Sequence, residues 1–351
     1  MQIDKVITVV DTHTAGEPTR IVTGGYPRVK GSSMAERRAF LAANHDDLRR
    51  LLMLEPRGHK DMFGAVLVEP ALADADVGVI FMDADGYLRM CGHGAIGVAT
   101  ALVELGVVKA TRPETVVTLD TPAGKIRASA AVDEHGSVQS VTFSGLASFA
   151  LALGVKVPAH EIHSSLQREF RVDIAQAGNV FGLVEIDQFG LGLGDKDLSF
   201  WVSAGLRIRD HLNRTNAGGV LGADRQVELV EFAEPLRDSG KVLRSRNMVV
   251  FGKGQVDRSP CGTGTLARLA VLHAEDRLGA GQTLVHQGIL GTEFSGRILE
   301  TYHENDYRGV MGEVTGSAYI TAFSNIVLQA GDPFASGFEL KNMTGVTGSE
   351  G

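Results

Sequence analysis

The sequence predicts an α/β (α+β) protein built from two related halves. Short segments rich in β-branched residues recur along the chain and alternate with a few helical segments. The pattern Cys-Gly-X-Gly occurs twice, at Cys91 and Cys261, and each copy precedes a run of small and apolar residues. The two cysteines lie 170 positions apart in a chain of 351 residues, close to half its length. This duplication indicates that each half places a cysteine at the start of a buried helix.

The strands are expected where β-branched and apolar residues cluster between turn-forming residues. They are residues 6–10, 20–23, 64–68, 77–82, 115–119, 138–143, 181–186, 227–232, 249–251, 319–323 and 326–329.

Three helices are expected. Residues 34–54 follow a capping box made by Ser33 and Glu36 and are ended by Pro56. Residues 95–105 follow the first cysteine motif and end at Gly106, and residues 265–278 follow the second and end at Gly279. Glycine is favoured after a helix because it adopts the left-handed conformation without strain.

The composition narrows the class of protein. Hydrophobic residues make up 44% of the chain and charged residues 22%, as in ordinary globular proteins. The formal net charge of −8 argues against nucleic acid or a membrane surface as a partner, because both attract clustered Lys and Arg. There is no signal-peptide pattern and no apolar run of the ~18 residues that a transmembrane helix needs. Two cysteines cannot form a disulfide framework, so we expect a cytoplasmic protein with reduced thiols.

The two thiols suit a proton transfer at opposite faces of one carbon atom. The dipole and free N–H groups at a helix N-terminus stabilise a thiolate, so we expect lowered pKa values for Cys91 and Cys261. The same N–H groups can bind a carboxylate. If the two helix starts face each other, one thiolate removes the proton beside the bound carboxylate and the opposing thiol protonates the other face, which inverts the carbon. This chemistry needs no metal and no cofactor.

Other interpretations remain open at this point. Buried cysteines are commonly inert core residues, and a redox disulfide is possible although the Cys-X-X-Cys spacing is absent. A cysteine hydrolase would leave the second thiol unexplained. Residues 92–97 and 262–267 fit loose forms of a dinucleotide-binding pattern, with Asp120 near the place of a ribose ligand. An NAD(P)-dependent oxidoreductase is therefore the alternative from another class, although the residues before both motifs are poor ends for a buried strand. The acidic residues Asp74, Asp76, Asp83 and Asp85 are interpreted as a solvated loop.

Several segments resemble the proline racemase family. They are residues 11–18 (DTHTAGEP), 55–59 (EPRGH), 90–94 (MCGHG), 257–265 (DRSPCGTGT) and 316–321 (GSAYIT). The resemblance implies the fold shared with diaminopimelate epimerase, in which two similar domains each wrap a curved, mostly antiparallel sheet around a central helix. The active site then lies between the domains. We expect residues 1–125 and 320–351 to form the half with Cys91, and residues 126–319 the half with Cys261.

The resemblance also implies roles for individual residues. Cys91 and Cys261 match the two acid/base thiols of the family. The backbone N–H groups of Gly92, His93, Gly262 and Thr263 would hold the substrate carboxylate, and Asp257, assisted by His93, would bind the ring nitrogen. The substrate would be a cyclic amino acid, proline or hydroxyproline, with no cofactor or metal, and a homodimer is common among relatives.

The expected activity is proline racemase. Dehydratases of the family often replace one cysteine by Thr or Ser, whereas this chain keeps both. Phe63 and Phe251 fall where proline racemases tend to carry Phe, and an apolar wall would leave a ring hydroxyl unpaired; each could instead be a core residue. Residues 177–181 (AGNVF) lie where the family often has a Gly-Gly pair followed by aromatic residues, and Val180 would enlarge the pocket. The alternatives are therefore 4-hydroxyproline 2-epimerase and trans-3-hydroxy-L-proline dehydratase.

Overall fold

The computed structural model describes residues 2–163, 169–279, 281–304 and 307–339. It is a mixed α+β protein in which strands dominate, which confirms the expected fold class. The helices are α1 (Met34–Asn44), α2 (Asp46–Met53), α3 (Gly92–Glu104), α4 (Ala159–Ile162), α5 (Leu198–Arg214) and α6 (Gly262–Ala274). The strands are β1 (Ile3–Thr14), β2 (Glu17–Gly24), β3 (Phe63–Val68), β4 (Val77–Asp83), β5 (Glu114–Thr121), β6 (Gly124–Val132), β7 (Val138–Val157), β8 (Phe170–Ala177), β9 (Asn179–Glu185), β10 (Leu229–Ala233), β11 (Arg237–Asp238), β12 (Val242–Phe251), β13 (Gln255–Val256), β14 (Thr283–Gln287), β15 (Glu293–Glu304), β16 (Tyr307–Gly316) and β17 (Ala318–Gln329).

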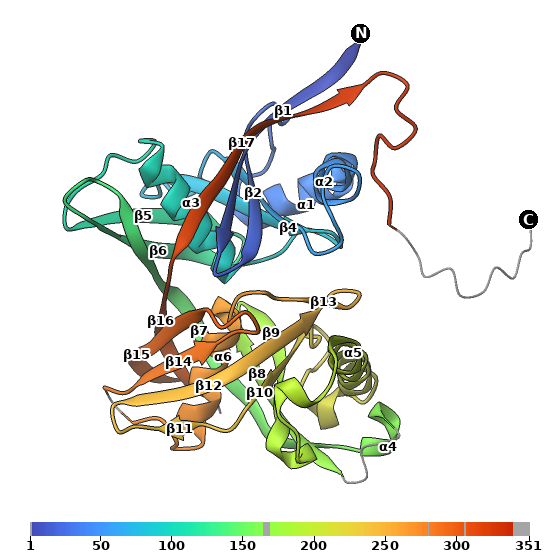
Figure 1. Cartoon of the computed structure of the whole chain (residues 1–351), viewed down its shortest axis with the longest axis vertical. Helices are drawn as coiled ribbons and strands as arrows, with labels where there is room; N and C mark the ends of the chain where they lie inside the picture. Colours follow the sequence, from blue (N-terminus) through green and yellow to red (C-terminus); the bar gives the residue numbers. More distant parts are fainter. Residues whose placement is uncertain (1, 164–168, 280, 305–306, 340–351) are drawn as a thin grey trace, which may run out of the picture.

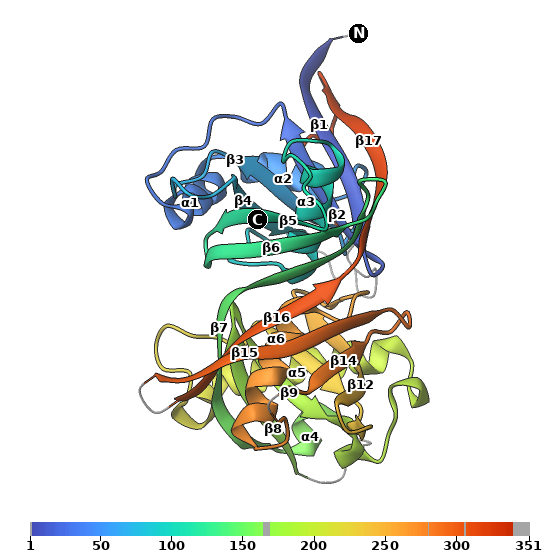
Figure 2. The same ribbon diagram turned by 90° about the vertical axis from the view of Figure 1, so that its left-hand side faces the viewer.

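The elements gather in two parts, one above the other in Figure 1. The upper part holds β1–β6, α1–α3 and the late strand β17, which pairs with β1 in antiparallel register. The lower part holds β8–β16 and α4–α6. The chain passes downward along the long strand β7 and returns from β16 into β17 (Figure 2). The last strand thus completes the sheet begun by the first one.

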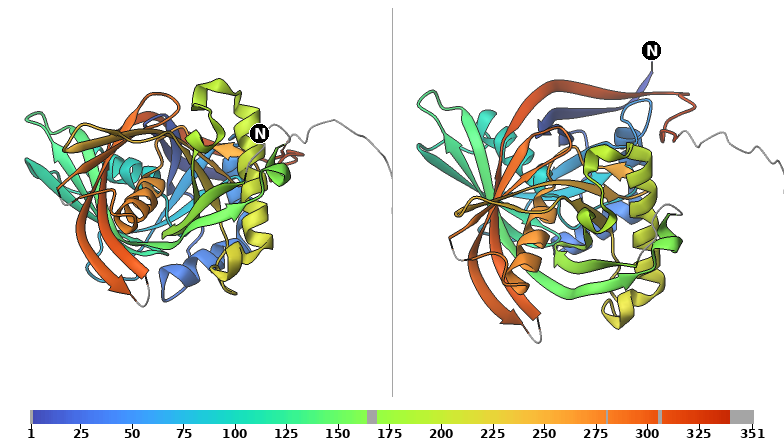
Figure 3. Two further views of the ribbon diagram at one scale, coloured as in Figure 1. Left: turned by 90° about the horizontal axis from the view of Figure 1, so that it is seen from below. Right: turned by 60° about the horizontal axis from the view of Figure 1, so that its bottom comes forward.

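Each part wraps its sheet around one central helix. In the lower part the pairings run β7–β8–β9–β10–β12–β14–β15–β16 and return from β16 to β7, which closes a ring. Figure 3 shows the orange helix α6 inside this ring. Every residue of α3 from Gly92 to Val103, and of α6 from Gly262 to Leu272, is buried. A helix that is apolar and small on all sides is suited to such a position.

The structure confirms the two cysteine-led helices and alters the other helix predictions. Gly106 follows α3 with φ +69, as expected of a glycine cap. Helix α6 stops earlier than predicted, at Ala274, because Asp276 takes up the left-handed conformation (φ +56) in place of Gly279. The predicted helix 34–54 is broken at His45, whose backbone is not helical (φ −141, ψ 29).

The capping prediction for α1 is confirmed in one direction. The Ser33 side chain accepts a hydrogen bond from the Glu36 backbone N–H at 3.2 Å. The Glu36 carboxylate, however, accepts from the backbone N–H and hydroxyl of Ser32, each at 2.7 Å, instead of from Ser33. The reciprocal half of the box is therefore displaced by one residue.

All the expected strands overlap observed ones, although residues 319–323 and 326–329 belong to the single strand β17.

We propose the two-part division expected from the sequence, with residues 1–125 and 320–351 in one half and residues 126–319 in the other. The expected boundaries, after residues 125 and 319, fall inside strands β6 and β17. We therefore propose that each structural unit ends at the nearer end of the strand and not within it. Among the described residues, none of the helices combines the length and apolar character needed to cross a membrane.

Candidate active site

The N-termini of α3 and α6 meet at two glycines. A Cβ atom added to Gly92 would lie 2.8 Å from the Cα of Gly262, and one added to Gly262 would lie 3.0 Å from the Cα of Gly92. The Phe143 ring closes the same contact, at 3.1 Å and 3.0 Å from the two added atoms. No other residue type fits at either position without displacing its neighbour. The glycines of the repeated motif therefore let the two helix starts touch.

Each cysteine of the repeated motif caps its helix. Cys91 Sγ accepts a hydrogen bond from the Gly94 backbone N–H at 3.3 Å, and Cys261 Sγ accepts one from the Gly264 N–H at 3.4 Å. Both thiols are free and buried. Their backbones differ, since Cys91 is extended (φ −143) and Cys261 is left-handed (φ +63). The latter conformation is strained for any residue except glycine.

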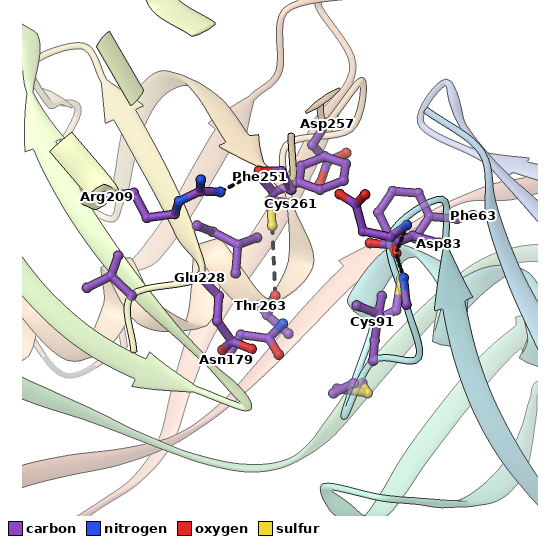
Figure 4. Close-up of a pocket in the computed structure, with 18 of the residues that line it drawn as sticks. Phe63, Asp83, Cys91, Asn179, Arg209, Glu228, Phe251, Asp257, Cys261 and Thr263 are labelled. Carbon is purple, nitrogen blue, oxygen red and sulfur yellow. Dashed lines mark hydrogen bonds between the residues drawn. The ribbon is translucent and has the colours of Figure 1, made fainter. Parts of the chain in front are cut away.

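A single pocket of about 510 Å³ lies between the two cysteines (Figure 4). All the residues that the sequence assigned to the site contribute to its lining: Phe63, Cys91, Gly92, His93, Phe251, Asp257, Cys261, Gly262 and Thr263. They come from both halves of the chain, from positions 63 to 263. The predicted set is therefore assembled around one cavity.

The expectation of lowered thiol pKa values is wrong for the unliganded pocket. Burial raises the pKa of Cys91 well above its ordinary value, and the Gly94 N–H opposes this only in part. Burial also raises the pKa of Cys261, followed by the charge of Asp257. Loss of hydration and nearby carboxylates thus outweigh the helix N-termini. Burial is the larger cause and favours the protonated form of both thiols, and the carboxylates add to it.

His93 is a neutral residue of the pocket wall. Burial lowers its pKa to about 3, against the opposing effect of the Pro18 carbonyl. Its ring nitrogens lie 3.4 Å from Cys91 Sγ, and the edge of the imidazole meets Phe63 with centroids 4.5 Å apart. Phe63 in turn packs against Phe251 at 5.2 Å. The two phenylalanines belong to the main hydrophobic cluster and also line the pocket, so the core and pocket interpretations both apply.

Asp257 supplies a buried carboxyl group beside the thiols. Its Oδ1 accepts from the Ser259 backbone N–H at 2.8 Å and from the Ser259 hydroxyl at 2.7 Å. Burial raises the pKa of Asp257 to about 6. Burial and the charge of Asp257 also raise the pKa of nearby Glu17, which accepts from the Arg258 backbone N–H. Such a site favours a ligand that carries a positive charge.

Asp83 does not lie in a solvated loop, which corrects the interpretation of the acidic run. It ends β4, is buried and lines the pocket. Its Oδ1 accepts from the backbone N–H groups of Asp85 and Gly86, both at 2.8 Å, and burial raises its pKa to about 6. The acidic spacing of the sequence carried no sign of this role.

The sequence also missed a polar side of the pocket. Asn179, Arg209, Asn213 and Glu228 line it, together with Leu229. Figure 4 shows Asn179 and Glu228 close together, on the side of the pocket away from Phe63 and Asp257. Arg209 and Asn213 lie on α5, a helix without any sequence motif. Asp197 caps the N-terminus of this helix, because its side chain accepts a hydrogen bond from the Phe200 N–H at 3.0 Å.

Val180 does not enlarge the pocket, contrary to expectation. It packs in a separate hydrophobic cluster, and its backbone N–H donates to Glu228 Oε2 at 3.0 Å. Because neighbouring residues of a strand point to opposite faces, the preceding residue, Asn179, faces the cavity. Within residues 177–181, it is therefore Asn179 that contributes a side chain to the pocket.

The dinucleotide-binding interpretation finds no support in the geometry. A loop, not a strand, connects β4 to the glycines of α3. The Asp120 carboxylate accepts from the backbone N–H groups of Ala71 and Leu72, at 2.7 and 2.9 Å, and is not part of the pocket lining. It therefore serves to order a loop.

Comparison with known proteins agrees with this geometry. The sequence model of the family described as "Proline racemase" matches residues 9–339. The chain is 42% identical to a proline racemase of Clostridioides difficile, with 97% of this chain and 100% of the relative covered. It is 40% identical to a 4-hydroxyproline 2-epimerase of Streptosporangium roseum and 38% identical to a trans-3-hydroxy-L-proline dehydratase of Bacillus cereus, with the same shares covered.

Solved structures share the whole fold. A probable proline racemase from Agrobacterium radiobacter matches with a TM-score of 0.84 and 31% identity, covering 95% of this chain and 96% of the other. A hydroxyproline epimerase from Agrobacterium vitis, solved with bound trans-4-hydroxy-L-proline, matches with a TM-score of 0.85 and 29% identity, covering 97% and 98%. With the fold, the pocket and the full-length matches in agreement, the chain belongs to the proline racemase family.

Proposed function

We propose that this protein is a cofactor-independent isomerase that inverts the α-carbon of a cyclic amino acid, with proline as its substrate. The observation that carries the proposal is the pair of buried thiols, each capping one of two touching helix N-termini, on a shared pocket. No feature of an oxidoreductase or a hydrolase explains this duplication.

The substrate carboxylate would bind where the helices meet. The backbone N–H groups of Gly92, His93, Gly262 and Thr263 lie in the first turns of α3 and α6, where they have no partner within the helix. Two helix dipoles add their positive ends at this point. As charge builds up on the carboxylate during proton removal, these groups would stabilise it.

The substrate nitrogen would activate the thiols. Burial, and in addition the charge of Asp257, raises the pKa of both cysteines, and a protonated ring nitrogen beside Asp257 would offset that charge. One thiol could then release its proton to solvent. The resulting thiolate takes the α-proton, and the electron pair left on the α-carbon delocalises into the carboxylate. The opposing thiol donates its proton to the other face and is left as the thiolate.

Phe63 and Phe251 support proline over a hydroxylated ring, since they provide an apolar wall next to Asp257. Asn179 and Glu228 support a second candidate, 4-hydroxyproline 2-epimerase, because they could pair a ring hydroxyl. Dehydration of trans-3-hydroxy-L-proline is less well supported, because the chain keeps both thiols. Initial rates with L-proline, trans-4-hydroxy-L-proline and trans-3-hydroxy-L-proline decide among these. Turnover of only a hydroxylated substrate would overturn our choice.

The setting of the enzyme is also a proposal. Free cysteines suit a reducing compartment, so we propose the cytoplasm. Membership of the family supports a homodimer, which analytical ultracentrifugation would test. The net charge of −8 supports a small molecule, and not nucleic acid or a membrane, as the partner.

A further inference from the structure

A buried polar network lies behind Cys261, outside the pocket lining. Glu231 on β10 and His286 on β14 have no exposed surface, and Asn247 on β12 has 1%. Neither carboxylate oxygen of Glu231 makes a well-formed hydrogen bond, and neither does His286 Nε2, although the Asn247 side chain lies near enough to Glu231 to lower its pKa. An unpaired buried carboxylate is costly and calls for an explanation. The proposed proton transfer does not use any of these groups directly.

Glu231 lies against the first turn of α6. A Cβ atom added to Gly264 would be 2.5 Å from Glu231 Oε2, and 3.2 Å from Cys261 Sγ on its other side. Gly264 also provides the N–H that binds Cys261 Sγ. A side chain at position 264 would therefore meet both the Glu231 carboxylate and Cys261, which shows that the carboxylate lies against this turn.

His286 joins Glu231 to the backbone of Cys261. The Asn247 amide nitrogen donates to the Pro260 carbonyl at 2.7 Å, which fixes the orientation of the amide, and it lies 3.2 Å from His286 Nδ1. Because that nitrogen can only donate, Nδ1 is the acceptor and the imidazole proton is on Nε2. Nε2 lies 3.9 Å from Glu231 Oε1. The neutral tautomer therefore carries its proton on the nitrogen nearer to Glu231, at a distance longer than a hydrogen bond.

The network ends on the two carbonyls that flank the strained residue. The Thr265 hydroxyl lies 2.8 Å from the Cys261 carbonyl and 3.1 Å from His286 Nδ1, and its one proton can be donated to either acceptor. Asn247 holds the carbonyl of Pro260, the preceding residue. A left-handed cysteine persists only where its surroundings over-determine it. Cys91, whose φ is −143, needs no such support.

We propose that Glu231 is a positioning residue for Cys261: together with His286, Asn247 and Thr265, it supports the left-handed backbone of this residue and gives its thiol surroundings that Cys91 does not have. The expected effect on catalysis rests on the proposed two-thiol function. The expected effect on the reactivity of the Cys261 thiol does not.

The two thiols have different charged neighbours, and Glu231 is near Cys261 alone. Cys261 has Asp257 and Glu231 near it, both of which raise its pKa after the effect of burial. Cys91 has Asp257, Glu17 and Asp83. Burial raises the pKa of Glu231 to about 7, and the positive charge of Arg268 on α6 offsets part of this increase. Glu231 is therefore ionised at the alkaline pH where thiols titrate, and its removal favours the Cys261 thiolate.

The test is the pH dependence of alkylation of each cysteine by iodoacetamide, followed by peptide mass spectrometry. The chain has only two cysteines, so each peptide reports one thiol. In Glu231→Gln we expect the Cys261 profile to move to lower pH by about one unit, and the Cys91 profile by far less. Glu300→Gln, on the exposed part of β15, is the matched control and should move neither. Equal shifts at both thiols, or none, would overturn the proposal.

Two further measurements separate a positioning role from general damage. In Glu231→Gln we expect kcat to fall about tenfold with KM changed less than about twofold; a loss confined to KM contradicts the proposal. If that variant does not fold, Thr265→Val removes the hydroxyl that lies against the Cys261 carbonyl. We expect it to move the Cys261 profile alone, to higher pH, and an equal change at Cys91 would contradict the proposal. Alkylation needs no substrate, so it stands even if no cyclic amino acid is turned over.

Discussion

Gly92 and Gly262 touch where α3 and α6 begin, and an added Cβ on either glycine would lie within 3.0 Å of the other residue's Cα. This contact joins the two halves of the chain and brings the free N–H groups of two helices to one place. The proposed carboxylate site depends on it. The first prediction tests that dependence.

We expect Gly92→Ala and Gly262→Ala to lower kcat/KM by about 10- to 100-fold each. Overpacking at a tight contact costs roughly 1–3 kcal/mol and would separate the helix starts. Gly194→Ala is the control, because a Cβ at that position meets no atom within 4 Å. Steady-state kinetics check this, and an alanine at either position that leaves kcat/KM at the wild-type value would show that the contact is unimportant.

The two thiols should be equally indispensable for inversion. We expect Cys91→Ser and Cys261→Ser each to lower the racemisation rate by ~10³-fold or more, because a serine hydroxyl is a far weaker acid than a thiol and neither ionises to act as the base nor gives up its proton readily. Circular dichroism of the folded variants controls for structure, and polarimetry measures the rate. Full racemisation by either variant refutes the two-thiol mechanism.

Asp257 should make the protein less stable as the pH rises. Burial raises its pKa to about 6 in the folded chain, above the ordinary value of 3.8. The folded state therefore binds the proton more tightly than the unfolded state, so its contribution to stability is present below about pH 4 and is lost as the pH rises through 6.

Replacement of Asp257 by Asn removes this effect. We expect the free energy of unfolding of Asp257→Asn, relative to wild type, to be higher at pH 8 than at pH 4, while the proposed activity is lost. Urea unfolding at the two pH values measures it. If the free energy of unfolding of the variant, relative to wild type, is no higher at pH 8 than at pH 4, the Asp257 carboxylate is not destabilised by burial.

Asn179 should decide between a plain and a hydroxylated ring. If it pairs a ring hydroxyl, Asn179→Ala should lower kcat/KM for trans-4-hydroxy-L-proline by about 10- to 100-fold and leave that for proline nearly unchanged. Asn325→Ala, on the exposed face of β17, is a suitable control. A loss that is equal for both substrates would assign Asn179 to the shape of the pocket alone.

The sequence predicts which residues come together at the centre of the pocket, because a local pattern marks them. A cysteine before glycine-rich helix starts is a local signal, and its duplication implies the pairing of α3 and α6. The broken helix at His45, the early end of α6 and the role of Asp83 depend on packing with distant segments, which a local pattern does not contain. The polar side of the pocket was missed for the same reason, since α5 carries no motif and the sequence does not show that Asn179, and not its neighbour Val180, lies on the pocket face of β9.

The most direct measurement is the fate of the α-proton when L-proline is incubated with the enzyme in D₂O. Two thiols that act from opposite faces predict that, early in the reaction, deuterium appears at Cα of the newly formed D-proline while the remaining L-proline keeps its hydrogen. Mass spectrometry after chiral separation measures both pools. Deuterium entering L-proline as fast as D-proline forms would contradict the account, because a single group would then remove and return the proton on the same face.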